Sequence, residues 1–326
     1  MTCQTIMILG MGGTIAGRSA RVSDNIGYTA AQVRVAELVA AIPALADNGP
    51  VMTEQVAQID SKDMSFSVWA QLAGRVNHFL AQPDVQGIVI THGTDTLEET
   101  AYFLHRVCQP TKPVVLTCAM RPATALVADG PQNLLDALTV ARQPDAKGVV
   151  TVCAGTIHSA LDVQKVHTYK LDAFSSGDAG PLGYVEEGCV RLLRNWPAAQ
   201  EPLAQAAIKN IANQLSLLKW PHVEIIMNYA GVSGAVVEAL VAQGVQGLVV
   251  AATGNGTLHH VLEVALLKAQ AAGIKVVRAT RCLNGRVLPK PDDRLPDSKG
   301  LNPVKARVEL MLHLLAGYAA SPDQRL

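Results

Sequence analysis

Residues 86–100 read QGIVITHGTDTLEET, and this stretch decides how the chain around it folds. Its first part is a short apolar run headed by Gly87, which is typical of a buried strand in an α/β protein. Leu97, Ala101 and Leu104 then recur at helical spacing, so a helix follows the strand. Hydroxyls, a carboxylate and an imidazole surround one glycine between them, whereas a helix cap would need only one of these groups. Because open α/β sheets bind ligands at the carboxyl ends of their strands, we expect a functional site here.

The same alternation of strand and helix continues along the chain. Because such alternation is typical of parallel sheets with right-handed crossovers, it predicts an α/β protein. The expected strands cover residues 5–9, 51–59, 86–90, 113–118, 148–154, 222–227, 246–252 and 274–280. Four expected helices cover residues 33–45, 68–81, 233–243 and 257–272, and another begins near residue 97. Two more begin at Pro131 and Pro303, since a proline suits the first turn of a helix.

Two stretches interrupt this alternation and suggest a domain boundary. Residues 155–190 are rich in glycine, and residues 191–213 contain Pro197 and Pro202 and look like a connection. We therefore predict two α/β domains with largely parallel sheets. The larger N-terminal domain covers residues 1–190, a linker covers 191–213, and the smaller C-terminal domain covers 214–326.

Composition excludes several classes of protein. The 326 residues are 49% hydrophobic, and the 27 basic residues balance the 27 acidic ones, which argues against nucleic acid as a partner. No apolar run reaches the length of a membrane span, and the N-terminal apolar segment is too short for a signal peptide. The six cysteines are scattered without zinc spacing, so we expect no metal site and a cytoplasmic location, and we expect most of the cysteines to be inert core thiols.

Two glycine patterns near the N-terminus imitate nucleotide-binding motifs but lack an essential residue. Gly10 and Gly12 begin a dinucleotide fingerprint, yet Ile15 stands where the third glycine belongs. Gly12 and Gly17 also approach the phosphate-binding loop pattern, but Arg18 replaces its lysine. We therefore expect no nucleotide and no other cofactor.

Two threonines follow strands that we expect to share one sheet. Thr14 comes directly after a pair of glycines that allow close approach to the backbone, and Thr94 follows the strand at residues 86–90. A threonine hydroxyl needs a group that takes its proton before it acts as a nucleophile. Tyr28 ends a polar segment long enough to form a lid over Thr14, and Lys165 could act as a base beside Thr94. From spacing alone, Thr14 could equally be a turn residue, and a surface position is the simpler interpretation of Lys165.

At this point the chain resembles the bacterial-type L-asparaginase/glutaminase family, and the resemblance covers almost the whole chain. It rests on two signature motifs in order and at family spacing, with further support along the chain. The matching residues are 12–15, Asp60-Ser61, 92–101, 119–122, 129–134, 181–183 and 254–256.

The resemblance implies hydrolysis of L-asparagine to L-aspartate and ammonia without metal or cofactor, with L-glutamine hydrolysis as a side activity. Thr14 matches the threonine that forms the acyl-enzyme, and Tyr28 matches the lid tyrosine that helps to activate it. Thr94, Asp95 and Lys165 match the second catalytic group, which is credited with the attacking water. The preference between asparagine and glutamine stays open at this stage.

Substrate binding is implied for a further set of residues. Ser61 and Asp95 match the residues that hold the α-carboxylate and α-amino group of the substrate, with Thr94 beside them. Lys62 stands where secreted members carry glutamine. Asn255 matches a residue that reaches the active site of a neighbouring subunit, which implies a homodimer or homotetramer with active sites at the dimer interface. An acidic residue of the loop 285–300 also belongs to the family site, and Asp292 and Asp293 are both candidates.

Two other functions share this fold. One is the amidotransferase subunit that releases ammonia for tRNA-dependent amidation, which carries an additional N-terminal domain. Here the first motif starts at residue 12. The other is a non-catalytic amino-acid sensor, which we would expect to have lost Thr14, Thr94 or Lys165, and all three are present. An asparaginase is therefore the function we expect.

Overall fold

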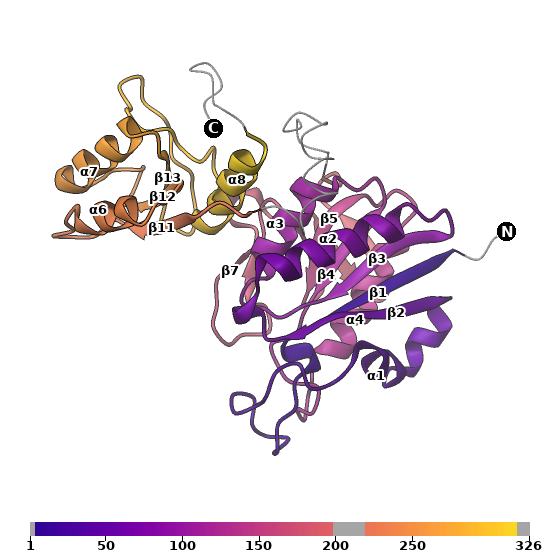
Figure 1. Cartoon of the computed structure of the whole chain (residues 1–326). Helices are drawn as coiled ribbons and strands as arrows, with labels where there is room; N and C mark the ends of the chain where they lie inside the picture. The colour runs from indigo at the N-terminus through magenta and orange to yellow at the C-terminus, as the bar shows by residue number, and fades with distance from the viewer. Residues whose placement is uncertain (1–3, 198–218, 318–326) are drawn as a thin grey trace. The chain divides into compact units, whose positions relative to one another are not determined.

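A computed structural model describes residues 4–197 and 219–317, and the chain divides into two compact units, Met1–Pro202 and Leu203–Leu326 (Figure 1). Each unit has its own largely parallel sheet with helices packed on it, which confirms the predicted fold class. The predicted domain limits stay a prediction, since residues 198–213 of the proposed linker lie outside the described residues. Its first two positions, Arg191 and Leu192, belong to the last strand of the larger sheet.

The first unit is built on an eight-stranded sheet in the order β10-β9-β6-β5-β4-β3-β1-β2. Five strands pair in parallel, and they are β1 (Thr5–Gly12), β2 (Val51–Ile59), β3 (Val85–Thr91), β4 (Pro113–Thr117) and β5 (Gly148–Cys153). Three antiparallel strands extend the β5 edge, and they are β6 (Thr156–Ser159), β9 (Gly183–Glu186) and β10 (Cys189–Leu192). The glycine-rich stretch that broke the predicted alternation therefore forms this antiparallel edge. A separate two-stranded sheet pairs β7 (Gln164–Lys165) with β8 (Phe174–Ser175).

Helices cover both faces of this sheet (Figure 1). On one face lie α1 (Val35–Ala40) and α4 (Gly130–Ala141), and on the other lie α2 (Phe66–Leu80) and α3 (Leu97–Cys108). Trp69 of α2 stacks on Phe103 of α3 with ring centroids 4.8 Å apart, and its indole donates to Thr100 Oγ1. Because both faces are covered, successive residues of β3 from Gly87 to Thr91 are all buried, which is why residues 87–90 form a continuous apolar run.

The predicted helix at residues 33–45 is shorter than expected. It covers only Val35–Ala40, and a 3-10 helix follows over Pro43–Asn48. Ile42 adopts φ −119° and ψ 89° because a following proline disfavours the helical conformation. Pro43 thus begins a new turn instead of continuing the old helix.

The second unit has a three-stranded parallel sheet in the order β11-β12-β13, formed by Val223–Met227, Gly247–Ala252 and Lys275–Thr280. Its helices are α6 (Ala235–Ala242), α7 (His260–Ala271) and α8 (Pro303–Leu315). Asn302 caps α8 by accepting a hydrogen bond from the Lys305 amide at 3.0 Å, as the sequence predicts.

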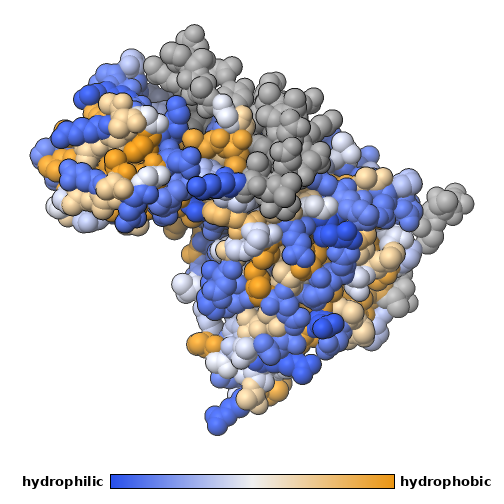
Figure 2. All heavy atoms as spheres, in the orientation of Figure 1, coloured by the Kyte–Doolittle hydropathy of each residue, from blue (hydrophilic) through white to orange (hydrophobic). Residues whose placement is uncertain are grey.

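Hydrophilic side chains cover most of the face of the first unit that is seen in Figure 2. Within residues 4–197 and 219–317, no helix combines the length and the apolar character that a membrane span needs.

Candidate active site

Three turns that carry polar side chains meet at one edge of the larger sheet. They follow β3, β1 and β2, which are neighbours in that order, and their strands run parallel. Thr14 lies in a 3-10 turn (Thr14–Ala16) after β1, Ser61 lies in another (Ser61–Asp63) after β2, and Thr94 follows β3. The carboxyl edge of the sheet therefore collects all three turns, which the sequence predicts for those of Thr14 and Thr94.

Thr14 forms a short hydrogen bond with the lid residue Tyr28. Thr14 Oγ1 and Tyr28 Oη lie 2.6 Å apart, and Thr14 is 7% exposed. Gly17 lies against the tyrosine ring, since a Cβ atom at that position would stand 2.8 Å from a carbon of the Tyr28 ring. Either hydroxyl can donate to the other, so the pair can pass a proton between its two oxygens.

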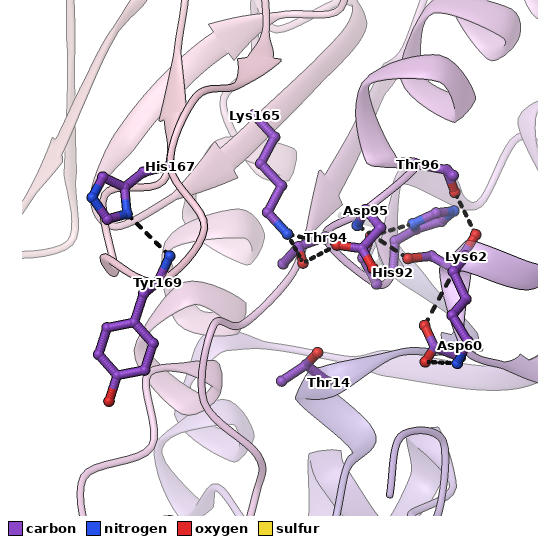
Figure 3. A network of polar contacts seen from close by, with 12 residues as sticks. Thr14, Asp60, Lys62, His92, Thr94, Asp95, Thr96, Lys165, His167 and Tyr169 are labelled. Atoms are coloured by element: carbon purple, nitrogen blue, oxygen red, sulfur yellow. Dashed lines mark hydrogen bonds and ion pairs between the residues drawn. The ribbon is translucent and has the colours of Figure 1, made fainter. Parts of the chain in front are cut away.

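Thr94, Asp95 and Lys165 form the second polar group (Figure 3). Lys165 Nζ donates to Thr94 Oγ1 at 2.8 Å and to Asp95 Oδ1 at 2.6 Å. The lysine comes from β7, more than sixty residues along the chain from the threonine, and its side chain is only 19% exposed. A lysine held this way can orient the threonine hydroxyl, and in its neutral form it can accept a proton from that hydroxyl.

Ser61 connects the turn after β2 to the turn after β3. Its Oγ accepts a hydrogen bond from the Asp95 amide at 3.1 Å, and its carbonyl accepts one from Thr96 Oγ1 at 2.8 Å. The hydroxyl proton of Ser61 is therefore directed elsewhere. Lys62, the next residue, pairs with Asp60 at 2.7 Å, and this partner raises the pKa of the lysine. Lys62 therefore remains a cation at the rim of the site.

The turns after β1 and β3 touch through two glycines. Gly13 has φ +77°, and a Cβ atom there would collide with the backbone of Gly93. A Cβ atom at Gly93 would in turn stand 2.5 Å from Ser61 Oγ. Since only glycine lets the backbones come this close, the contact fixes the spacing between Thr14 and Thr94.

His92 lies at the centre of this contact and was not singled out by sequence reasoning as a site residue. It is 0% exposed, and its Nδ1 donates to the Gly93 carbonyl at 2.7 Å, which places a proton on Nδ1. Burial lowers the pKa of the imidazole to about 4. One signal in the sequence could have identified it, namely a histidine directly after an apolar strand. A charged residue is not buried at such a position, so this histidine is expected to be neutral.

Asn255 and the candidate acidic residues belong to the second unit. Asn255 Nδ2 donates to the Leu288 carbonyl at 3.1 Å, and Asn255 Oδ1 accepts from the Leu288 amide at 2.7 Å. Asp293 pairs with the buried Arg278 at 2.7 Å, and this partner lowers the pKa of Asp293. Asp292 is exposed beside it. Asn255 thus fastens its own loop to Leu288, and Asp293 holds the following loop.

In the parts of the chain that the structure describes, no group of three or more histidine, cysteine and acidic side chains is arranged to hold a metal ion. The polar groups at this edge of the sheet include hydroxyls, the ammonium groups of Lys165 and Lys62, and the carboxylates of Asp95 and Asp60. Such a set can activate a hydroxyl nucleophile and bind a zwitterion.

The fold and these groups define an α/β protein in which two threonines at one sheet edge are each hydrogen-bonded to a tyrosine or a lysine. Residues 5–198 match the family described as "Asparaginase, N-terminal", and residues 222–325 match "Glutaminase/Asparaginase C-terminal domain". The chain therefore belongs to the asparaginase family, as the resemblance of its motifs indicates.

Individual relatives cover most of the chain. The L-asparaginase 2 of Escherichia coli is 40% identical over 95% of this chain and 88% of its own length. A glutaminase-asparaginase of Pseudomonas fluorescens is 38% identical over 98% of this chain and 89% of its own length. The solved structure of a probable cytoplasmic L-asparaginase from Campylobacter jejuni superposes with a TM-score of 0.88 at 38% identity, and the match covers 95% of each chain.

The glycine contact predicts an unusual sensitivity at Gly13. Gly13→Ala would place a side chain both at positive φ and against Gly93, so we expect it to lower the free energy of unfolding by about 2–4 kcal/mol. Gly74→Ala is the matched control, because this glycine lies inside α2 with open space around it. Gly74→Ala should raise the free energy of unfolding by about 0.5–1 kcal/mol. Urea unfolding of both variants measures the difference, and equal effects would contradict the proposed contact.

The buried His92 predicts a pH dependence of stability. Its pKa is lower in the folded protein than in the unfolded chain, so only the unfolded chain binds a proton between pH 6.5 and about 4. Stability should therefore fall as the pH falls through this range. His92→Asn cannot titrate but keeps a donor for the Gly93 carbonyl. Between pH 7 and pH 5, urea unfolding should show the wild type losing about 2 kcal/mol more than this variant. Parallel pH profiles would exclude a buried neutral imidazole.

Proposed function

We propose that this protein is an L-asparaginase, which hydrolyses the side-chain amide of L-asparagine to L-aspartate and ammonia, with L-glutamine as a secondary substrate. The observation that carries the proposal is the pair of hydroxyl groups with activating partners, Thr14 with Tyr28 and Thr94 with Lys165, at one sheet edge. Relatives named L-asparaginase and glutaminase-asparaginase support both substrates. The reaction uses no metal and no cofactor.

The first step forms a covalent intermediate on Thr14. Thr14 Oγ1 attacks the amide carbon and transfers its proton to the Tyr28 oxygen, while the tyrosine proton moves to the departing nitrogen. The carbon–nitrogen bond breaks, ammonia leaves and an ester to Thr14 remains. The 2.6 Å distance between the two oxygens supports this direct transfer. Backbone amides near the turn stabilise the oxyanion.

The second step releases the product. A water molecule held by Thr94, Asp95 and Lys165 attacks the ester carbon, its hydroxide becomes part of L-aspartate, and its proton returns to Thr14. The contacts of Lys165 with both neighbours support this role, because they align the Thr94 hydroxyl and hold the lysine beside it. Two sequential displacements restore the free enzyme.

Ser61 and Asp95 hold the zwitterionic part of the substrate, with Thr94 and Lys62 beside them. Ser61 uses its oxygen to accept from the Asp95 amide, so its proton can go to the substrate carboxylate. The Asp95 carboxylate is half exposed and can pair with the substrate ammonium. These roles predict that a free amino acid is preferred over an amide without charges.

The proposed assembly is a homodimer or homotetramer in which Asn255 completes the active site of a neighbouring subunit. The two hydrogen bonds between Asn255 and Leu288 support this, because they give the asparagine loop a fixed shape that a partner could use. We propose a cytoplasmic location, which the description of the Campylobacter jejuni structure supports, although a relative in Haemophilus influenzae is named periplasmic.

Substitution of the two threonines tests the mechanism. Thr14→Ala removes the nucleophile, so turnover should be lost while L-aspartate still binds. Thr94→Val should lower kcat/KM by about 10²–10³-fold, because one hydrogen-bonding group of the transition state is missing. Ammonia release from L-asparagine, D-asparagine and L-glutamine measures both effects. Mass spectrometry of a slowly processed substrate should find the acyl adduct on Thr14, and an adduct on Thr94 would reverse the assigned roles.

Mixing two inactive variants tests the shared site. In a mixed dimer of Thr14→Ala and Asn255→Ala, one site is intact and the other carries both defects. Random refolding makes about half of the dimers mixed, so roughly a quarter of wild-type activity should return. Refolding each variant alone is the control. If mixed dimers are confirmed by mass and no activity returns, Asn255 serves only its own chain.

A further inference from the structure

The lid, which we define as residues 17–29, brings Tyr28 to Thr14 but is only partly held by its own contacts. Arg18 and Thr29 exchange backbone hydrogen bonds of 2.9 Å, which close the base of the lid. Asp24 Oδ1 accepts from the amides of Ile26 and Gly27 at 3.0 and 2.7 Å and shapes its tip. These bonds shape the lid itself. They do not attach its outer part to the sheet edge, so that attachment must come from another part of the chain.

A second loop binds the lid from outside the three motif turns. We call residues 121–127 the platform loop, and four hydrogen bonds join it to the lid. The Ala123 amide donates to the Gly17 carbonyl at 3.0 Å, and the Leu126 amide donates to the Val22 carbonyl at 2.9 Å. The Ser19 amide donates to Thr124 Oγ1 at 2.8 Å, and the same hydroxyl donates to the Ser19 carbonyl at 3.4 Å.

The platform loop is itself fastened to the scaffold through Asp129, at the start of α4. The Asp129 carboxylate accepts from the amides of Met120 and Arg121, both at 2.9 Å, and from Asn133 Nδ2 at 3.3 Å. The Arg121 guanidinium donates to the Val127 carbonyl at 3.0 Å and closes the loop. The platform loop is therefore a fixed support on the helix that covers the sheet.

Thr124 makes the side-chain contacts among these four bonds, and the other two join backbone to backbone. Its hydroxyl both accepts from and donates to Ser19, so the residue type at position 124 controls how firmly the lid is held. We propose that the platform loop is the docking site of the closed lid, and that Thr124 is a positioning residue that keeps Tyr28 over Thr14.

This inference rests on the proposed function only for its effect on turnover. When the lid leaves the platform loop, Tyr28 leaves Thr14. Only a fraction of the molecules is then in the closed state that binds substrate. Apparent substrate affinity falls by that fraction, while saturating substrate draws the lid back. Loss of the Thr124 hydroxyl therefore raises KM and leaves kcat within about twofold of wild type, whereas Tyr28→Phe lowers kcat.

Hydrogen exchange of the backbone amides tests the docking site without any substrate. Thr124→Val removes both side-chain bonds, and Thr124→Ser retains a hydroxyl. Thr139→Val is the matched control, because the Thr139 hydroxyl donates within α4, to the Leu135 carbonyl at 3.1 Å. A net hydrogen-bond loss predicts about fivefold faster exchange in the lid of Thr124→Val. Thr124→Ser and Thr139→Val should exchange there as the wild type does.

Each outcome decides the proposal. Faster exchange confined to the lid, a raised KM and recovery in Thr124→Ser support it. Lid exchange equal to wild type in Thr124→Val overturns it, as does faster exchange spread equally through α4, or an unchanged KM despite a loosened lid. If the wild type releases no ammonia from L-asparagine, the proposed function fails, and the exchange measurement alone still decides whether the platform loop holds the lid.

Discussion

The close contact between Gly13 and Gly93 is the constraint on which the rest of the site depends. It lets the turn after β1 press against the turn after β3, and a side chain at either position would enter the other turn or Ser61. The sheet supplies the parallel strands, but adjacent strands alone bring backbones only to about 4.8 Å. The glycines bring the turns beyond their strands into contact, so Thr14 and Thr94 stand at a separation set by backbone atoms. Positions that are set by backbone contacts vary less than positions that are set by flexible side chains. This matters because small displacements of reacting groups change catalytic rates.

The polar groups around this contact are charged only where solvent can reach them. His92 is completely buried and stays neutral because burial lowers its pKa. The Lys165–Asp95 pair lies further out, where the carboxylate is half exposed and Lys165 Nζ lies 2.6 Å from its Oδ1. The neutral interior therefore supports the turns, and the charged rim is available for a zwitterionic ligand. If the charged pair stood in the interior and the histidine at the rim, charged groups would be buried beside the sheet. The rim would then lack the carboxylate that can bind an ammonium.

Much of the fold followed from sequence periodicity, whereas the arrangement of the site followed only in part. The buried run at residues 86–90 and the cap at Asn302 have local causes, so the strand and the start of α8 could be predicted. Thr94 and Lys165 lie far apart in the chain and meet through a small sheet, β7 with β8, that has only two residues in each strand. Strands this short have no detectable periodicity in the sequence. The expectation that Lys165 lies beside Thr94 therefore came from the resemblance of the motifs and not from a predicted strand pair. The platform loop was missed for a similar reason, since two of its four bonds to the lid join backbone atoms, which leave no mark in residue type, and the other two use the single side chain of Thr124.

These features divide the candidate site into a rigid part and an adjustable part. Ser61, Thr94 and Thr14 stand on turns that are bonded to one another and to the sheet edge, and they need no movement to be ready for a ligand. Tyr28 arrives on a lid whose outer residues are exposed and whose attachment to the platform loop uses a few hydrogen bonds. Net hydrogen-bond energies of about 1 kcal/mol each are strong enough to favour a closed lid and weak enough to let it open for ligand exchange. The proposed nucleophile Thr14 on the rigid part and its proposed proton partner Tyr28 on the adjustable part would meet only when the lid is closed, which would link proton transfer to the exclusion of water.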